Sequence, residues 1–149
     1  MGNNHVKKIT FLKVALVVCA TAHVCEEYFG GFVAYIDYFF PGVTAAHFIV
    51  FNALFLLYMF ALFLKNNVLI VSIPILLLIN AAIHMSGLIV FHKYNPGVVT
   101  AAMLYVPVSL VFLRTLKPPR FVIKKSLLVA AAVMSVPLLF QLIRLFFEK

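Results

Sequence analysis

Two adjacent glutamates, Glu26 and Glu27, lie in an apolar stretch of the sequence, and a histidine, His23, precedes them by one helical turn. Residues three and four apart share one face of an α-helix, so the imidazole can point the same way as both carboxylates. A charge in the middle of a membrane costs at least roughly 2.5–3.5 kcal/mol, which makes such residues functional candidates. An imidazole nitrogen and carboxylate oxygens on one helix face are suitable metal ligands.

Two more histidines are expected at a similar depth in the membrane. About 1.5 Å per residue, counted from the ends of the apolar runs, puts His23 about 21 Å above the cytoplasmic edge of a core about 30 Å thick. The same count puts His47 and His84 about 24 Å above that edge. Three imidazoles at one level favour a functional polar centre in the outer half of the bilayer. The alternative is a buried His–Glu hydrogen-bond network that only holds the helices together.

Three further polar residues are expected around this centre. Asn80 lies one turn from His84 on the same helix face, and His92 and Tyr94 follow the end of that helix at the outer surface. The full set of predicted ligand, catalytic and supporting residues is His23, Glu26, Glu27, His47, His84, Asn80, His92 and Tyr94.

The donor set predicts a divalent transition metal. Three imidazoles and one carboxylate, with water as a further ligand, are typical of zinc, and the second glutamate would then act as general base in a hydrolysis. A di-iron, oxygen-activating centre is the alternative, but such centres usually hold more carboxylates than Glu26 and Glu27 supply. Zinc is therefore favoured over iron, with Glu26 and Glu27 as the catalytic residues.

Membrane helices are needed to position these residues. Of the 149 residues 65% are hydrophobic and 11% are charged, whereas soluble domains average about 45–50% and about 25%. The sequence predicts an all-α, polytopic transmembrane bundle that forms one domain over residues 1–149. Because Gln141 and Arg144 lie in the last apolar run, four spans and a surface helix are the alternative to five. The apolar runs are 9–29, 43–64, 68–91, 98–113 and 126–147, with a basic linker over 114–125.

The net charge of +8 is explained by membrane topology and does not indicate nucleic-acid binding. Basic residues sit at the edges of the apolar runs, and cytoplasmic loops of membrane proteins are enriched in them. A cytoplasmic N-terminus puts nine inside and three outside, so the lipid bilayer is the expected partner. The inside set is Lys7, Lys8, Lys13, Lys65, Arg114, Lys117, Arg120, Lys124 and Lys125, and the outside set is Lys93, Arg144 and Lys149.

A short internal echo links two segments of the chain. Residues 38–46 (YFFPGVTAA) resemble residues 94–102 (YNPGVVTAA), and each follows a run with an embedded histidine. One interpretation is duplication of a two-helix unit, over about residues 9–64 and 68–113. The alternative is that Pro-Gly followed by Thr-Ala-Ala is a favourable way to begin a membrane helix.

Three segments form a recognisable pattern: His23-x-x-Glu26-Glu27, Asn80-x-x-x-His84 and Tyr94-Asn-Pro96-Gly97-x-x-Thr100. Together they resemble the HXXEE-motif family of small bacterial integral membrane proteins, and the resemblance covers most of the first four helices. It implies the cytoplasmic (inner) membrane of a bacterium and supports the importance of His23, Glu26 and Glu27 without naming a reaction. The chain is also similar in outline to glutamate-type intramembrane proteases, but this likeness is weaker because the arginine expected after the glutamate pair is missing.

The sequence therefore predicts a metal-dependent membrane enzyme that acts on a lipid or other apolar substrate reached from the outer leaflet. A hydrolase is favoured, and a di-iron oxidoreductase is the other enzyme candidate. Two alternatives come from other classes of protein. One is a proton- or cation-coupled transporter or binding protein that uses Glu26 and Glu27, and the other is a structural subunit whose polar centre only fixes helix packing.

Overall fold

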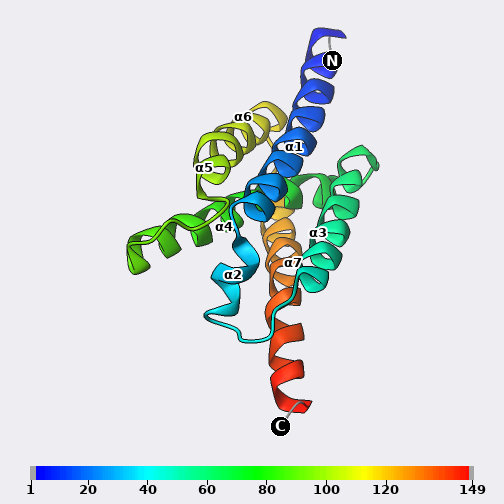
Figure 1. The fold of residues 1–149 in the computed structure, drawn as a ribbon. Helices are drawn as coiled ribbons and strands as arrows, with labels where there is room; N and C mark the ends of the chain where they lie inside the picture. The colour runs from blue at the N-terminus through cyan, green and yellow to red at the C-terminus, as the bar shows by residue number, and fades with distance from the viewer. Residues whose placement is uncertain (1–2, 148–149) are drawn as a thin grey trace.

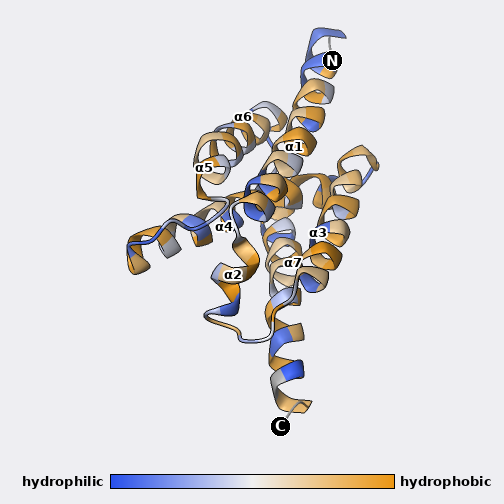
Figure 2. Cartoon of the chain, viewed as in Figure 1, coloured by the Kyte–Doolittle hydropathy of each residue, from blue (hydrophilic) through white to orange (hydrophobic). Residues whose placement is uncertain are grey.

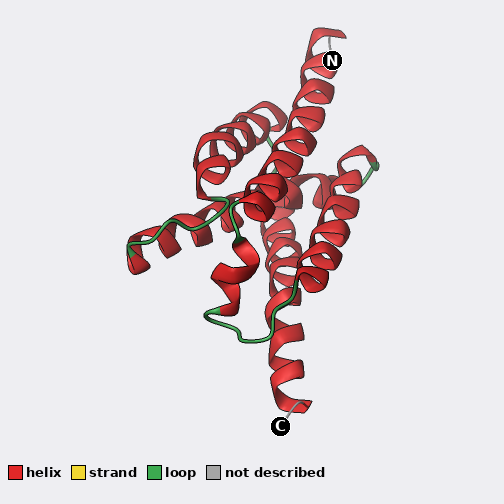
Figure 3. Cartoon of the chain, viewed as in Figure 1, coloured by secondary structure: helices red, strands yellow, loops and turns green. Residues whose placement is uncertain are grey.

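The computed structural model describes residues 3–147, and these are helical apart from short connections (Figures 1 and 3). Lys149, one of the basic residues in the predicted topology, lies outside the described residues. In chain order the segments are α1 (Asn3–Phe29), α2 (Phe32–Asp37), α3 (Ala45–Met59), the 3-10 turn η1 (Phe60–Phe63), α4 (Asn67–Phe91), α5 (Val98–Thr100), the π-helical turn η2 (Ala101–Tyr105), α6 (Val106–Leu116) and α7 (Arg120–Phe147).

Five helical stretches are long and apolar enough to cross a membrane, which confirms the predicted all-α, five-span class. Apolar residues predominate along these helices (Figure 2). α1 begins and α7 ends at opposite extremes of the molecule (Figure 1). The stretches are Asn3–Phe29, Ala45–Phe63, Asn67–Phe91, Val98–Leu116 and Arg120–Arg144.

Gln141 and Arg144, the polar residues that leave a four-span alternative open, both face other parts of the protein. Gln141 is buried, and the guanidinium of Arg144 donates hydrogen bonds to the carbonyls of Pro41 and Gly42 in the connection between α2 and α3. Carbonyls at such a turn are natural acceptors for a guanidinium, which carries donors only. This contact joins the C-terminal part of α7 to the loop that precedes α3.

The last two helices meet at a shorter connection than the predicted linker over residues 114–125. α6 continues to Leu116 and ends at Lys117, which adopts a left-handed backbone with φ of 49°. Pro118 and Pro119 cannot extend α6 because their rings fix φ and lack an N–H donor. The carbonyl of Pro119 then accepts the first bonds of α7, from Val122 and Ile123, so residues 120–125 are helical.

The fourth apolar run stays helical through Pro107, where an interruption is expected from the sequence. A proline in a helix clashes with the carbonyl four residues earlier and removes one hydrogen bond. Here the wide π-helical turn over Ala101–Tyr105 directly precedes Pro107. Such turns shift the hydrogen-bond register within a helix and are frequent at functional sites.

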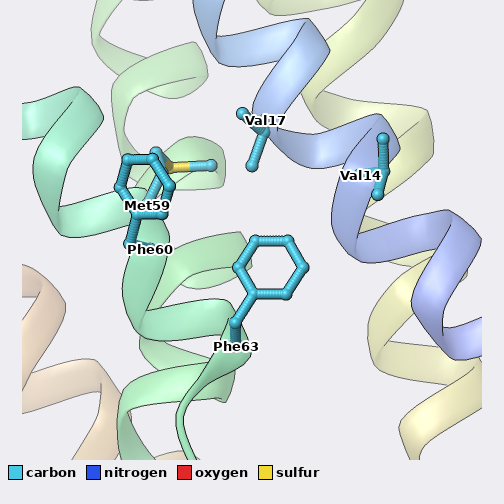
Figure 4. Close-up of a pocket in the computed structure, with 5 residues that line it drawn as sticks. All are labelled: Val14, Val17, Met59, Phe60 and Phe63. Atoms are coloured by element: carbon cyan, nitrogen blue, oxygen red, sulfur yellow. The ribbon is translucent and has the colours of Figure 1, made fainter.

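The core surrounds α4, half of whose most apolar window is buried, against 17% for α7. Ser126 donates a hydrogen bond to the carbonyl of Val68 and joins α7 to α4, while the hydroxyls of Tyr58 and Ser72 join α3 to the same helix. A cavity of about 200 Å³ between α1 and the end of α3 is purely apolar (Figure 4). It is lined by Val14, Val17, Met59, Phe60 and Phe63, and it carries no chemistry.

Candidate metal centre

Three polar side chains from two helices converge in the interior: His23 and Glu27 of α1 and His84 of α4. Glu27 Oε1 lies 3.4 Å from His23 Nε2 and 3.2 Å from His84 Nε2. One ligand atom from each of the three residues lies within 4.8 Å of the others. All three are buried, with exposed fractions of 2% for His23, 6% for Glu27 and 3% for His84. His23 and Glu27 meet because they are one turn apart on α1.

The hydrogen bonds of His84 determine which of its nitrogens carries hydrogen. Asn95 Nδ2 donates to the main-chain carbonyl of His84 over 3.1 Å. Because that carbonyl can only accept, this bond sets the orientation of the Asn95 amide and leaves its Oδ1 facing His84 Nδ1, also at 3.1 Å. An amide oxygen can only accept as well, so Nδ1 of His84 is the donor. In the neutral imidazole, Nε2 then presents a lone pair to Glu27.

The orientation of the His23 imidazole follows in the same way from its hydrogen bond with Thr100. The hydroxyl of Thr100 donates its single hydrogen to the carbonyl of Gly97 over 3.2 Å. It can therefore only accept from His23 Nδ1, which lies 2.9 Å away. The remaining nitrogen, Nε2, is buried without a hydrogen-bond partner among the described residues and faces Glu27.

The outcome is a cluster of one carboxylate oxygen and two Nε2 atoms, each of which carries a lone pair in the neutral form of its imidazole. Lone pairs at this separation in a buried site repel one another unless a cation or a proton lies between them. Metal-binding histidines have this arrangement, in which the second ring nitrogen donates to a neighbouring acceptor and directs the first toward the metal. Two histidines and one glutamate form a known set for catalytic zinc. The residues present therefore fit a divalent metal.

Gly97 covers this cluster closely and could not carry a side chain. Its φ is +96°, in the region that favours glycine. A Cβ added here would lie 2.7 Å from His23 Cε1, 2.8 Å from His84 Cε1 and 3.0 Å from Glu27 Cγ. The backbone of the turn before α5 thus closes one side of the site, which only a glycine allows.

Glu26 lies outside this group, although it is adjacent to Glu27. Its Oε1 accepts from the Tyr94 hydroxyl at 2.8 Å and the Val99 N–H at 3.2 Å, and its Oε2 accepts from the Thr100 N–H at 2.7 Å. A carboxylate at the N-terminus of a helix satisfies N–H groups that have no partner within the helix. The hydrogen bond to Glu26 raises the pKa of the Tyr94 hydroxyl above its ordinary value.

The two carboxylates therefore differ in role from the sequence-based assignment, in which one binds metal and the other acts as base beside it. Glu27 faces the two imidazoles, and Glu26 holds the start of α5 against α1. The difference arises because the Glu26 carboxylate meets the N–H groups of residues 99 and 100 and not the two imidazoles.

A family model for proteins of unknown function with an HXXEE motif matches residues 14–112. The chain belongs to this family. The match contains the motif His23-x-x-Glu26-Glu27 as well as His84, Asn95, Gly97 and Thr100, and it confirms the resemblance inferred from the sequence. No curated protein and no solved structure matches the chain. The function of this family is unknown, so only the geometry of the site indicates what the chain does.

The structure does not bring His47, the third histidine of the predicted centre, into the cluster. His47 lies in the first turn of α3, where its Nδ1 contacts the Thr44 N–H at 3.2 Å and the Thr44 hydroxyl at 3.1 Å. The Thr44 hydroxyl in turn accepts from the His47 N–H, which completes a reciprocal cap. The His47 ring packs against the Phe140 ring of α7, with centroids 5.4 Å apart. Counting residues along a helix predicts the depth of a side chain but not its direction, and the His47 ring is directed toward α7.

Asn80 and His92 also contribute no atom to the group. Asn80 lies one turn before His84, and its Oδ1 is buried without a hydrogen-bond partner among the described residues. His92 is exposed and ends α4 in a left-handed conformation with φ of 50°. Tyr94, the third expected supporting residue, acts on Glu26 and not on the cluster itself.

Three residues that position the cluster are absent from the predicted site set: Asn95, Gly97 and Thr100. All lie in the segment Tyr94-Asn-Pro96-Gly97-x-x-Thr100, which the resemblance to the family already singled out. A polar side chain in a loop gives no periodic signal that would show where it points. The available signal was the echo of this segment at residues 38–46, which marks the turn but not its partners.

Proposed function

We propose that this protein is a metal-dependent integral membrane enzyme whose metal ligands are His23 Nε2, His84 Nε2 and a carboxylate oxygen of Glu27. The observation that carries the proposal is the hydrogen-bond pattern of the two imidazoles. Thr100 and Asn95 make both Nδ1 atoms donors, so in the neutral imidazoles both Nε2 lone pairs are available beside one buried carboxylate. A divalent cation satisfies all three groups at once.

Zinc suits this donor set better than a di-iron centre. The cluster holds one carboxylate, because Glu26 is bound to N–H groups of α5, and di-iron centres of helical bundles use several. His23, His84 and Glu27 would hold the zinc ion, which would supply a bound water acidic enough for hydrolysis near neutral pH. Hydrolysis is therefore the favoured reaction.

An amphiphilic cavity next to the cluster supports a lipid or other apolar substrate. It has a volume of about 310 Å³ and is lined by Tyr35, Tyr38, Phe39, Phe91 and Lys93. The Tyr35 hydroxyl and the Asn95 amide, the partner of His84, both adjoin the same glycine, Gly87. The cavity therefore lies within a few side chains of the proposed metal position. Lys93 and the aromatic rings match a molecule with one anionic group and an apolar body.

Metal analysis of the purified protein tests the proposal. Protein extracted in mild detergent and washed with a weak chelator is expected to retain about one zinc per chain, whereas Glu27→Gln, which keeps the side-chain shape, loses it. Asp37→Asn is the matched control, because Asp37 accepts only from the Gly42 N–H in a loop, and it is expected to retain the metal. Metal-free wild-type protein with native helicity by circular dichroism would contradict the proposal.

Burial of the cluster favours a second candidate, a cation-coupled transporter or binding protein. Glu27 is 6% exposed and Gly97 closes one side, as in a site that binds a cation in an occluded state. Purified protein in liposomes would then show cation flux that Glu27→Gln abolishes. Hydrolysis of added lipid without such flux would favour the enzyme instead.

A further inference from the structure

One buried hydroxyl next to the cluster has no partner in the structure. Tyr105 is fully buried, yet its hydroxyl forms no hydrogen bond with any described residue. Buried hydroxyls are nearly always paired, and an exception calls for an explanation such as a ligand. The ring of Tyr105 packs against the imidazole of His23, with centroids 4.5 Å apart and an interplanar angle of 35°.

The backbone at Tyr105 is unusual as well. Tyr105 ends the π-helical turn η2, which follows directly after Thr100, the residue that orients His23. A π-helical turn adds one residue to the helical repeat and rotates the side chains that follow it, which is one way to direct a side chain into a site. The contact between the Tyr105 ring and the His23 imidazole places this side chain beside the cluster.

We propose that the Tyr105 hydroxyl donates a hydrogen bond to the small ligand, water or a substrate oxygen, that occupies the open coordination position of the centre. The proposal rests on the metal centre proposed above. Tyr105 and the metal would hold the same ligand atom from two sides. The competing explanation is that Tyr105 serves only as an aromatic ring in the core, with its hydroxyl unused.

The two explanations differ in what loss of the hydroxyl should do. If Tyr105 contacts the bound ligand, Tyr105→Phe weakens ligand binding but leaves the metal and the fold in place. Because the hydroxyl has no hydrogen-bond partner among the described residues, its removal should leave the melting temperature unchanged or raise it. Tyr58→Phe is the matched control. The Tyr58 hydroxyl forms a hydrogen bond of 2.5 Å with the Ser72 hydroxyl, and neither residue belongs to the cluster.

Azide binding to the cobalt-substituted protein measures the effect directly. Co²⁺ replaces the metal in detergent-purified protein, and azide is titrated while the visible absorption of the cobalt is recorded. Wild type and Tyr58→Phe are expected to bind azide equally. Tyr105→Phe is expected to hold one Co²⁺ per chain and to bind azide about tenfold more weakly, the effect of one lost hydrogen bond.

Each other outcome overturns a defined part of the argument. Azide affinity in Tyr105→Phe equal to that of wild type rejects the role of Tyr105 and leaves the metal centre standing. Loss of Co²⁺ from Tyr105→Phe, with a lower melting temperature, assigns the residue to packing around His23 and also rejects the proposal. Failure of the wild type to bind Co²⁺ or zinc rejects the metal centre and this inference together.

Discussion

The two Pro-Gly turns of this protein have nearly the same sequence and different surroundings. Gly42 and Gly97 both adopt positive φ, 86° and 96°. Thr44 lies two residues after its glycine and is the N-cap of α3, where its hydroxyl accepts from His47. Thr100 lies three residues after its glycine, inside the first turn of α5, and its hydroxyl accepts from His23 instead.

The Thr100 hydroxyl is available to His23 because the Glu26 carboxylate, and not Thr100, caps the N–H groups at the start of α5. The carboxylate of Glu26 on α1 accepts hydrogen bonds from the N–H groups of Val99 and Thr100. At the first turn Asp37 accepts from the Gly42 N–H and Arg144 donates to the Gly42 carbonyl, so this turn is held by residues far from the cluster. The same local turn is thus structural in one place and part of the candidate site in the other.

Histidine substitutions are expected to separate the two turns most strongly. His84→Ala removes a proposed zinc ligand and leaves Glu27 buried with one fewer partner, so zinc affinity should fall by more than about a hundredfold. His47→Ala removes half of the α3 cap and should cost about 1 kcal/mol of stability with zinc retained. Zinc content and chemical denaturation measure both effects. Equal zinc loss in the two variants would show that His47 contributes to zinc binding as much as His84 does.

The glycines should differ next, because their surroundings differ in stiffness. An alanine at position 97 would press its Cβ against two imidazoles, and we expect Gly97→Ala to lower stability by roughly 2–4 kcal/mol and to displace the metal. At position 42 the nearest atoms are the guanidinium of Arg144, 2.9 Å from the added Cβ, which can move aside. Gly42→Ala should cost about 1 kcal/mol, chiefly for positive φ, with unchanged zinc affinity. Isothermal titration with zinc tests the pair.

Threonine substitutions test the hydrogen bond that orients His23. Thr100→Val keeps the shape and removes the acceptor of His23 Nδ1, so zinc affinity should fall about tenfold while one zinc per chain still binds at saturation. Thr44→Val removes a helix cap and should lower the stability by about 1 kcal/mol with no change in zinc affinity. A competition titration with a chromogenic chelator gives both affinities. Unchanged affinity in Thr100→Val would remove Thr100 from the site.

The smallest effect is expected at Glu26, which acts on the cluster only through Thr100. Glu26→Gln keeps one acceptor oxygen and places an amide NH₂ against a donor, so one of its three hydrogen bonds is lost. We expect a fall in zinc affinity of a few fold, by loosening of the turn before α5, and a loss of about 1 kcal/mol in stability. A fall as large as that of Glu27→Gln, measured by the same chelator competition, would instead make Glu26 a ligand.

The fold class and part of the site follow from particular residues. The five apolar runs predict the five helices, because few charges interrupt them and short segments with Pro, Gly or polar residues separate them. His23 and Glu27 are one turn apart on a single helix, so local geometry alone brings them together. The helical start at residues 120–125 was missed, since a basic stretch after two prolines resembles a linker although Pro119 begins a helix.

The sequence by itself determined the membrane-type helical fold, the family and the pairing of His23 with Glu27, because composition, motif and helical spacing are local properties. Tertiary structure alone decided that His84 joins them and His47 does not, that Glu26 turns to α5, and that Asn95 and Thr100 orient the two imidazoles. These choices depend on the rotation of each helix about its axis and on where one loop crosses another helix. Packing of all the helices together sets both.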